Sequence, residues 1–134
     1  MTSPYYQSFL GIRTETDADG NAYCTFVPGA TSIGREGVMH GGAVASLLEA
    51  AGFACLRAAL DQREAEGSPP LTAEVLSTTV DYLRPGLSIE SFAQAQIVKM
   101  GGRSASLLVE AWNTDRSKPV AAANMTLLIR PREG

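Results

Sequence analysis

The segment from Gly37 to Glu49, GVMHGGAVASLLE, gathers the residue types that could carry out chemistry. It holds His40, the single histidine of the chain, then Gly41 and Gly42, and one carboxylate, Glu49, in an otherwise apolar run. No Ser, Thr, Asp or Asn stands where a helix is expected to begin, so its first N–H groups are predicted to lack a side-chain acceptor. Those donors, at the positive end of the helix dipole, would be available to an anionic oxygen. The alternative is an ordinary glycine N-cap with water on the amides.

Glu49 belongs to a narrow polar stripe on the same helix. At about 100° per residue, Ser46, Glu49, Phe53 and Arg57 lie within roughly 80° of one another. Such a stripe is most often the solvent-facing side of a buried helix, which would leave Glu49 and Arg57 exposed. In the alternative, the stripe faces a cleft or a second subunit, where a desolvated carboxylate would have a raised pKa and could act as a base.

The spacing of Gly41 and Glu49 bears on how many copies of the chain form one site. Eight residues correspond to about 12 Å along a helix. A carbonyl under attack needs the base and the oxyanion donor on opposite sides, each about 3 Å away. One straight helix does not supply both, whereas two antiparallel copies related by a two-fold axis do. The spacing therefore predicts two identical sites at a dimer interface.

The elements that position these residues follow from the hydrophobic pattern. A helix is predicted from Gly42 to about Asp61, because this stretch is rich in Ala and Leu, free of proline and apolar around most of its circumference. Gly52 in its middle is expected to permit close packing against a sheet. Before the helix, two short strands at 11–15 and 21–27 are expected around an Asp19-Gly20 turn, and 28–37 is expected to be loop.

Strands make up the rest of the chain. Four are predicted, at 71–83, 88–100, 103–114 and 120–129. Gly101-Gly102 is expected to form a two-residue hairpin turn of the kind that tolerates positive φ. The order of elements predicts an α+β domain in which a curved antiparallel sheet wraps one long central helix.

Length and composition fit one domain that spans residues 1–134. The chain is 45% hydrophobic and 19% charged, and its net charge of −3 excludes the basic footprint of a nucleic-acid-binding protein. The charge is uneven, at −6 over residues 1–83 and +3 over 84–134. This asymmetry fits either a small anionic ligand near the C-terminal half or solvated surface charge.

Several other classes are not expected. The apolar stretch 43–60 is interrupted by four polar or small residues and is not predicted to span a membrane. The N-terminus lacks the basic and apolar regions of a secretory signal, so a cytoplasmic location is predicted. Cys24 and Cys55 have no C-x-x-C partner, so no metal site or redox motif is expected, and two buried thiols are predicted.

The chain also resembles a known family. His40-Gly41-Gly42 with Glu49 nine residues after the histidine, the segment 80–86 (VDYLRPG) and the segment 98–104 (VKMGGRS) are similar to motifs of the hotdog-fold acyl-CoA thioesterases of the PaaI type. The resemblance covers most of the chain. It implies hydrolysis of an acyl-CoA thioester by a homodimer or homotetramer without a metal or cofactor, in which the dimer joins two sheets into one.

Residue roles follow from this resemblance. It implies that the Gly41 N–H is the oxyanion donor and that Glu49, from the other protomer, is the nucleophile or general base. His40 would fix the loop beside the thioester and not act as the base, because protonation is disfavoured at a helix start. The substrate-binding candidates are Gly42, Phe53, Arg84, Lys99, Gly102, Arg103 and Ser104. Arg84, Lys99 and Arg103 could bind the CoA phosphates, or the last two could be solubilising charges at a hairpin tip.

Two departures from the family pattern favour a second interpretation. Gly34 stands where many members have Asn or Gln, and Phe53 stands where many have Thr or Ser. Both changes remove polar groups, and Ser32, Glu36 or Thr78 are the candidate replacements. The alternative function is a hotdog module that binds acyl-CoA without turnover. A hydratase or dehydratase on the same fold is disfavoured, because the chain has no second histidine.

Overall fold

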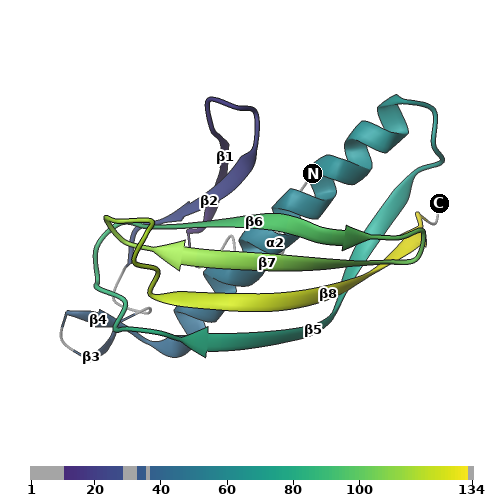
Figure 1. Ribbon diagram of the computed structural model, residues 1–134. Helices are drawn as coiled ribbons and strands as arrows, with labels where there is room; N and C mark the ends of the chain where they lie inside the picture. Colours follow the sequence, from purple (N-terminus) through teal and green to yellow (C-terminus); the bar gives the residue numbers. More distant parts are fainter. Residues whose placement is uncertain (1–10, 29–32, 36, 133–134) are drawn as a thin grey trace.

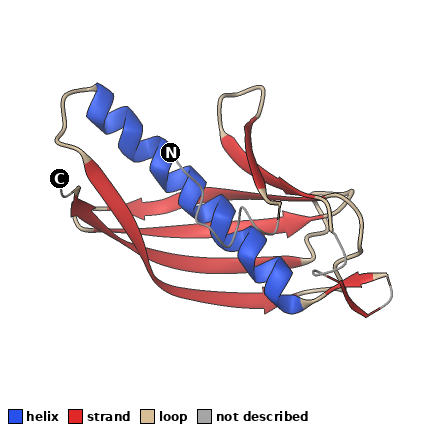
Figure 2. Cartoon of the chain, turned by 180° about the vertical axis from the view of Figure 1, so that it is seen from behind, coloured by secondary structure: helices blue, strands red, loops and turns tan. Residues whose placement is uncertain are grey.

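The computed structural model describes residues 11–28, 33–35 and 37–132. One long helix, α2 (Gly41–Ala65), lies across one face of a six-stranded antiparallel sheet, with the strands curving around it (Figures 1 and 2). The strand order in the sheet is β1-β2-β6-β7-β8-β5. Its strands are β1 (Arg13–Thr16), β2 (Ala22–Phe26), β5 (Leu71–Tyr82), β6 (Ser91–Met100), β7 (Ser104–Trp112) and β8 (Ala121–Pro131). The predicted α+β architecture of a sheet wrapped around a central helix is therefore confirmed.

Two local predictions are wrong. The stretch 28–37, predicted as loop, contains β3 (Ile33–Arg35), which pairs with β4 (Val38–Met39) in a separate two-stranded sheet just before the helix. Strands of three and two residues are too short to show an alternating pattern. Neither Gly101 nor Gly102 has a positive φ. The Gly101 N–H donates to the Ser104 oxygen at 2.9 Å, so the hairpin turn is centred on Gly102 and Arg103, one residue later than predicted.

Gly52 lets the helix approach the sheet closely, as predicted. A Cβ at this position would overlap the sulfur of Met125 on β8 and would lie 3.5 Å from Val109 on β7. Met125 and Val109 are both fully buried, so the side chains around Gly52 have little room to move aside. By length and composition α2 could cross a membrane, but 61% of its most apolar stretch is buried inside the molecule. It is the core helix of the domain.

Arg57 is buried at 5% exposure, so the expectation that the stripe leaves it in solvent is wrong. Its Nη1 donates to the main-chain oxygen of Leu71 at 2.7 Å, and its Nε donates to Asp61 at 3.0 Å. Both partners lie near the end of α2 and the start of β5. The guanidinium therefore fastens the helix to the strand that follows it, and its burial is compensated by an ion pair and a hydrogen bond.

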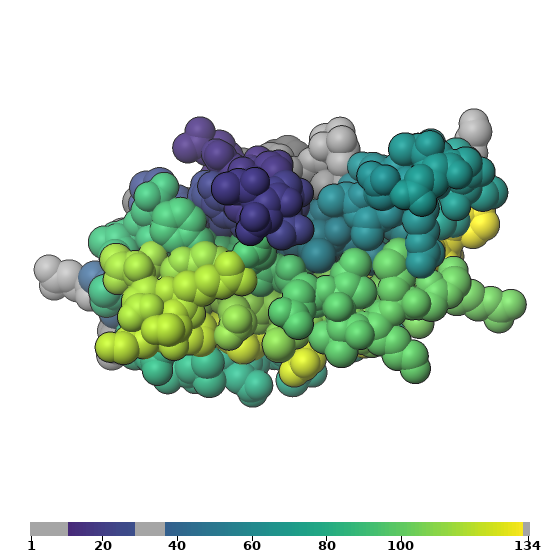
Figure 3. Space-filling model, turned by 45° about the horizontal axis from the view of Figure 1, so that its top comes forward, coloured from purple at the N-terminus to yellow at the C-terminus, as the bar shows by residue number. Residues whose placement is uncertain are grey.

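The β1–β2 hairpin is held by a polar and aromatic cluster. In Figure 3 the hairpin, in purple, lies against the yellow-green segment that joins β7 to β8. Gln94 donates to the Asp17 carboxylate at 3.0 Å and accepts from Arg116, whose guanidinium lies 4.6 Å from the ring centre of Trp112. The hydrogen bond from Gln94 is the main reason that the pKa of Asp17 is lowered.

Candidate active site

The start of α2 is capped by His40. The Nδ1 atom of His40 accepts a hydrogen bond from the Ala43 N–H at 3.0 Å, so the predicted absence of a side-chain acceptor is wrong, and so is the glycine N-cap. A histidine fills the role that Ser, Thr, Asp or Asn usually takes. The N–H groups of Gly41 and Gly42 have no hydrogen-bond partner among the described residues. Two of the first three helix donors therefore remain available.

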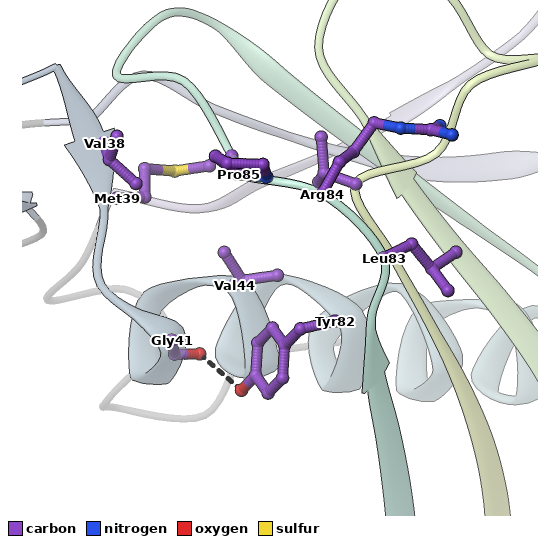
Figure 4. Close-up of a pocket in the computed structure, with 10 residues that line it drawn as sticks. Val38, Met39, Gly41, Val44, Tyr82, Leu83, Arg84 and Pro85 are labelled. Carbon is purple, nitrogen blue, oxygen red and sulfur yellow. Dashed lines mark hydrogen bonds between the residues drawn. The ribbon is translucent and has the colours of Figure 1, made fainter.

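A cleft of about 540 Å³ lies at the start of α2, where Gly41 forms part of its lining (Figure 4). Its lining comes from β4, from the first turn of α2, from the end of β5 with the segment that follows it, and from the residue before β8, and it is mostly apolar. The lining residues are Val38, Met39, Gly41, Val44, Tyr82, Leu83, Arg84, Pro85, Gly86 and Val120. The cleft thus combines apolar walls with main-chain N–H groups at a helix N-terminus, an arrangement that suits an apolar ligand carrying a polarised oxygen.

The loop that forms one wall of the cleft is fixed by buried polar groups. Asn113, at 7% exposure, accepts from the Leu87 N–H at 2.9 Å and donates to the buried hydroxyl of Ser91 at 2.8 Å. On the other side of the loop, the Met39 N–H donates to the Gly86 oxygen at 2.9 Å. The wall is therefore bonded to the strand that leads directly into His40 and Gly41.

Glu49 lies two turns further along α2, on the same continuous helix as Gly41. Its side chain is half-buried and makes no hydrogen bond or ion pair with any described residue. Thr78 offers a second unpartnered group, because its hydroxyl is buried and has no hydrogen bond within the described chain. Thr78 pairs across the sheet with Met125, which contacts Gly52, so Thr78 is on the helix-facing side of β5.

The basic candidates lie in two places. Lys99 and Arg103 are exposed at the β6–β7 turn, which Figure 1 places at the end of the sheet opposite the start of α2. Gly102 and Ser104 belong to the same exposed turn. Arg84 lines the cleft, but its guanidinium donates to the Pro119 oxygen at 2.8 Å and points away from Gly41 (Figure 4). One chain therefore does not bring the hairpin bases to the helix start.

The two residues that depart from the family pattern, Gly34 and Phe53, lie in different parts of the fold. Phe53 is partly buried against the hydrophobic core, one helical turn after Glu49. Gly34 lies in β3, and the candidate replacements Ser32 and Glu36 lie outside the described residues. The side chain next to Gly42 is that of His40, since a Cβ at Gly42 would lie 3.3 Å from the imidazole ring.

Two residues of the site had no role assigned from the sequence, although Tyr82 belongs to the family-like segment 80–86. The hydroxyl of Tyr82 donates to the Gly41 oxygen at 2.9 Å, and Asn113 fixes the wall of the cleft. Both act on segments more than twenty residues away in the chain. These two hydrogen bonds cannot be predicted from local periodicity, because periodicity shows only which residues lie on the same face of one helix or strand.

A single long helix wrapped by an antiparallel sheet, with a glycine pair at the helix start and a cleft lined by the first of the two glycines, defines a hotdog-fold protein of the thioesterase type. Residues 36–120 match the family model of the Thioesterase superfamily, and the chain belongs to this superfamily.

Individual proteins of similar sequence or structure are consistent with this assignment. The chain is 28% identical over 128 residues to the medium/long-chain acyl-CoA thioesterase YigI of Salmonella typhimurium, covering 90% of this chain and 82% of the relative. The Escherichia coli PaaI protein from the phenylacetic acid degradation operon has a similar structure, with a TM-score of 0.75 and 24% identity over 98% of this chain and 86% of PaaI. The BH2602 protein from Bacillus halodurans, solved with CoA, has a TM-score of 0.74 and 20% identity over 97% and 81% of the two chains. The two structural likenesses show the shared fold.

Proposed function

We propose that this protein hydrolyses an acyl-CoA thioester to a free acid and CoA. The observation that carries the proposal is the pair of N–H groups, of Gly41 and Gly42, that have no partner in the described part of the chain, with Gly41 lining an apolar cleft in a chain of the Thioesterase superfamily. The thioester oxygen becomes negatively charged when the carbonyl carbon is attacked, and two main-chain donors at a helix N-terminus stabilise that charge. The YigI relatives are named as acyl-CoA thioesterases, which supports the substrate class.

Glu49 is the proposed catalytic carboxylate, and two routes use it. In the first, Glu49 attacks the carbonyl carbon, CoA leaves as the thiolate, and water hydrolyses the resulting anhydride. In the second, Glu49 takes a proton from the water molecule that attacks the carbonyl carbon. A half-buried carboxylate that pairs with no cation of the described residues suits either role. Both routes end in the free acid and CoA.

The carboxylate and the oxyanion donors come from different copies of the chain in this proposal. Gly41 and Glu49 are separated by about 12 Å on one helix, which is too far for one thioester carbonyl. The edge strand β5 supports an antiparallel dimer, because it is 12 residues long and exposes Val75 and Leu76. Such an edge is rarely left open in a stable protein. Pairing two β5 strands would join the two sheets.

The same dimer would give the β6–β7 turn a role in substrate binding. Lys99 and Arg103 lie far from the helix start of their own chain, at the opposite end of the sheet. An antiparallel copy would bring this end toward the partner's helix start. Phosphate groups of CoA are then the proposed partners of these two bases.

The test of the activity is a panel of acyl-CoA esters of different chain length and aromaticity, assayed for release of free thiol. Glu49→Gln keeps the size and the hydrogen-bonding capacity of the side chain but removes the base and nucleophile. The kcat of this variant is expected to fall at least about 10²-fold, while binding of acyl-CoA persists. An unchanged kcat would show that Glu49 is a solvated helix residue without a catalytic role.

A mixing experiment tests the shared site. Gly41→Pro removes one oxyanion donor and suits the first helical position, because His40 already has the extended conformation that precedes proline. The new Cβ would lie 3.2 Å from the Tyr82 hydroxyl oxygen, so the tyrosine side chain would have to shift slightly. Pure Gly41→Pro and pure Glu49→Gln proteins are expected to be inactive. In a co-expressed mixture, half of the dimers are mixed and each has one intact site, so about a quarter of the wild-type activity returns. If no activity returned, the oxyanion donor and the carboxylate of one site would have to come from the same chain.

Phe53 favours one alternative, a module that binds acyl-CoA without hydrolysis. The residue places an apolar ring one turn after Glu49, where a polar side chain could have held water. In this case acyl-CoA would bind to the wild-type protein and to Glu49→Gln with equal affinity, and neither protein would release thiol.

A further inference from the structure

Tyr82 makes a contact at the helix start that the proposed mechanism leaves unused. Its hydroxyl donates a hydrogen bond to the main-chain oxygen of Gly41 at 2.9 Å, shown dashed in Figure 4. The ring lies against the glycine, because a Cβ at residue 41 would lie 3.2 Å from the hydroxyl oxygen and 3.4 Å from Cζ. A glycine at this position therefore allows the tyrosine to reach the main chain.

The tyrosine is itself held firmly by the sheet. It is the last residue of β5 and pairs with Ala121 on β8. The next two N–H groups, of Leu83 and Arg84, donate to the Val120 oxygen at 2.8 and 3.2 Å. The main chain that carries Tyr82 is thus fixed on the sheet, and the hydrogen bond of its hydroxyl links the first turn of the helix to that sheet, although 57% of the residue is exposed.

The acceptor oxygen and the Gly42 N–H belong to the same peptide group, the one that joins Gly41 to Gly42. A hydrogen bond accepted by the oxygen of a peptide group polarises the group and makes its N–H a stronger donor. The Gly42 N–H has no partner among the described residues and lies at the cleft end of the helix. Two successive glycines offer the backbone much conformational freedom, which a contact to the sheet reduces.

We propose that Tyr82 is a positioning residue that orients and polarises the Gly41–Gly42 peptide, and so makes the Gly42 N–H a second oxyanion donor beside that of Gly41. The proposal rests on the proposed thioesterase function. Negative charge reaches the substrate oxygen mainly in the transition state, so a stronger donor there raises kcat and leaves ground-state binding nearly unchanged. The effect of Tyr82 should therefore be found in kcat and not in KM.

The first test is Tyr82→Phe, which keeps the ring and removes only the hydroxyl. We expect kcat to fall about two- to tenfold, the range of one neutral hydrogen bond, with KM unchanged. In a ¹⁵N–¹H NMR spectrum the Gly42 amide resonance should move. The matched control is Tyr23→Phe on β2, since the Tyr23 hydroxyl has no hydrogen bond in the described part of the chain. The control should leave kcat and the Gly42 resonance in place.

A second substitution tests the direction of the effect. Replacing Tyr82 with 3-fluorotyrosine gives a more acidic phenol and hence a stronger donor. At a pH where this phenol stays protonated, kcat should rise above that of wild type, or at least remain well above that of Tyr82→Phe. A purely structural role for the ring would make no distinction between the three side chains.

Three outcomes would overturn the inference. An unmoved Gly42 resonance in Tyr82→Phe would do so whatever the activity. An active wild-type enzyme and a Tyr82→Phe variant with equal kcat would also do so, as would a change in KM alone, which would make Tyr82 only a wall of the cleft. Failure of the proposed function looks different, because the wild-type protein itself would then release no thiol from acyl-CoA.

Discussion

The Nδ1 atom of His40 accepts the Ala43 N–H at 3.0 Å, so the imidazole next to the glycine pair is the cap of the central helix. This hydrogen bond requires a ring that is unprotonated at Nδ1, because a protonated nitrogen has no lone pair to accept with. It also distinguishes the third N–H group of the helix from the first two. The third N–H is used for capping, and the N–H groups of Gly41 and Gly42 have no partner among the residues that the structure describes.

The cap predicts a stability effect. His40→Ala is expected to lower the free energy of unfolding by about 0.5–2 kcal/mol, the usual range for loss of an N-cap acceptor. His40→Asn, which restores a short acceptor, should recover most of that loss. Urea unfolding followed by circular dichroism measures both variants. Equal losses in the two would show that a different contact of the imidazole, and not the cap, stabilises the fold.

A second prediction concerns the packing of helix against sheet. By helix propensity alone, Gly52→Ala would stabilise the helix by about 0.5–1 kcal/mol. Its new methyl group would instead overlap Met125, and overpacking of a buried site typically costs about 1–3 kcal/mol. We therefore expect a net loss of stability in thermal or urea unfolding.

The double variant Gly52→Ala with Met125→Val separates packing from helix propensity. Shortening residue 125 makes space for the methyl group, so the two changes together should cost less than the sum of the single changes. Strict additivity would mean that Gly52 and Met125 do not compete for the same space.

Features confined to one element could be predicted from the sequence. The periodicity of α2 predicted that Gly41 and Glu49 lie two turns apart, and alternating strands with glycine and proline breaks predicted the sheet. Which face of a helix is buried depends on what packs against it. The stripe containing Arg57 was expected in solvent, but the start of β5 covers the guanidinium and gives it a main-chain acceptor at Leu71.

Contacts between distant segments could not be predicted. The bond from Tyr82 to Gly41 spans 41 residues, and Asn113 reaches Leu87 across 26. Both depend on the order of strands in the sheet, which local patterns do not specify. The histidine cap was missed for another reason, since propensity favours shorter polar side chains at that position.

The positive hairpin gives a third prediction, which depends on the proposed substrate. Replacing both Lys99 and Arg103 with Ala should raise KM for acyl-CoA and leave kcat nearly intact, because contacts to remote phosphates are the same in ground and transition states. The increase should shrink as salt is added, since exposed charges are screened within about 8–10 Å at physiological ionic strength.

A truncated thioester that lacks the nucleotide is the control for this prediction. Its KM should be the same for the wild-type protein and the double variant. Equal losses of affinity for the truncated and complete substrates would show that the two bases support the hairpin and do not contact CoA. Lys118→Ala, an exposed base outside the hairpin, is a matched variant for the general effect of charge.

The last prediction concerns the thiols of the protein, which bear on any assay that detects free CoA. Both cysteines are unpaired, with Cys24 fully buried and Cys55 half-buried. Burial raises the pKa of each thiol above its usual value, and in Cys24 a contact with Thr14 opposes this only in part. The thiolate is the reactive form, so a raised pKa leaves less of it at neutral pH, and its share increases as the pH rises toward the pKa.

Alkylation by iodoacetamide, followed by mass spectrometry, measures this reactivity. At pH 7.5 (about the pH of an enzyme assay) both thiols of the folded protein should react at least about tenfold more slowly than after unfolding in urea. Cys24 should be the slower of the two because solvent does not reach it. The rate at Cys55 should increase steadily with pH beyond the range where an ordinary cysteine levels off. A Cys55 that reacted equally fast in folded and unfolded protein would contradict its partial burial, and would require Cys55→Ser before thiol release could be used to measure turnover.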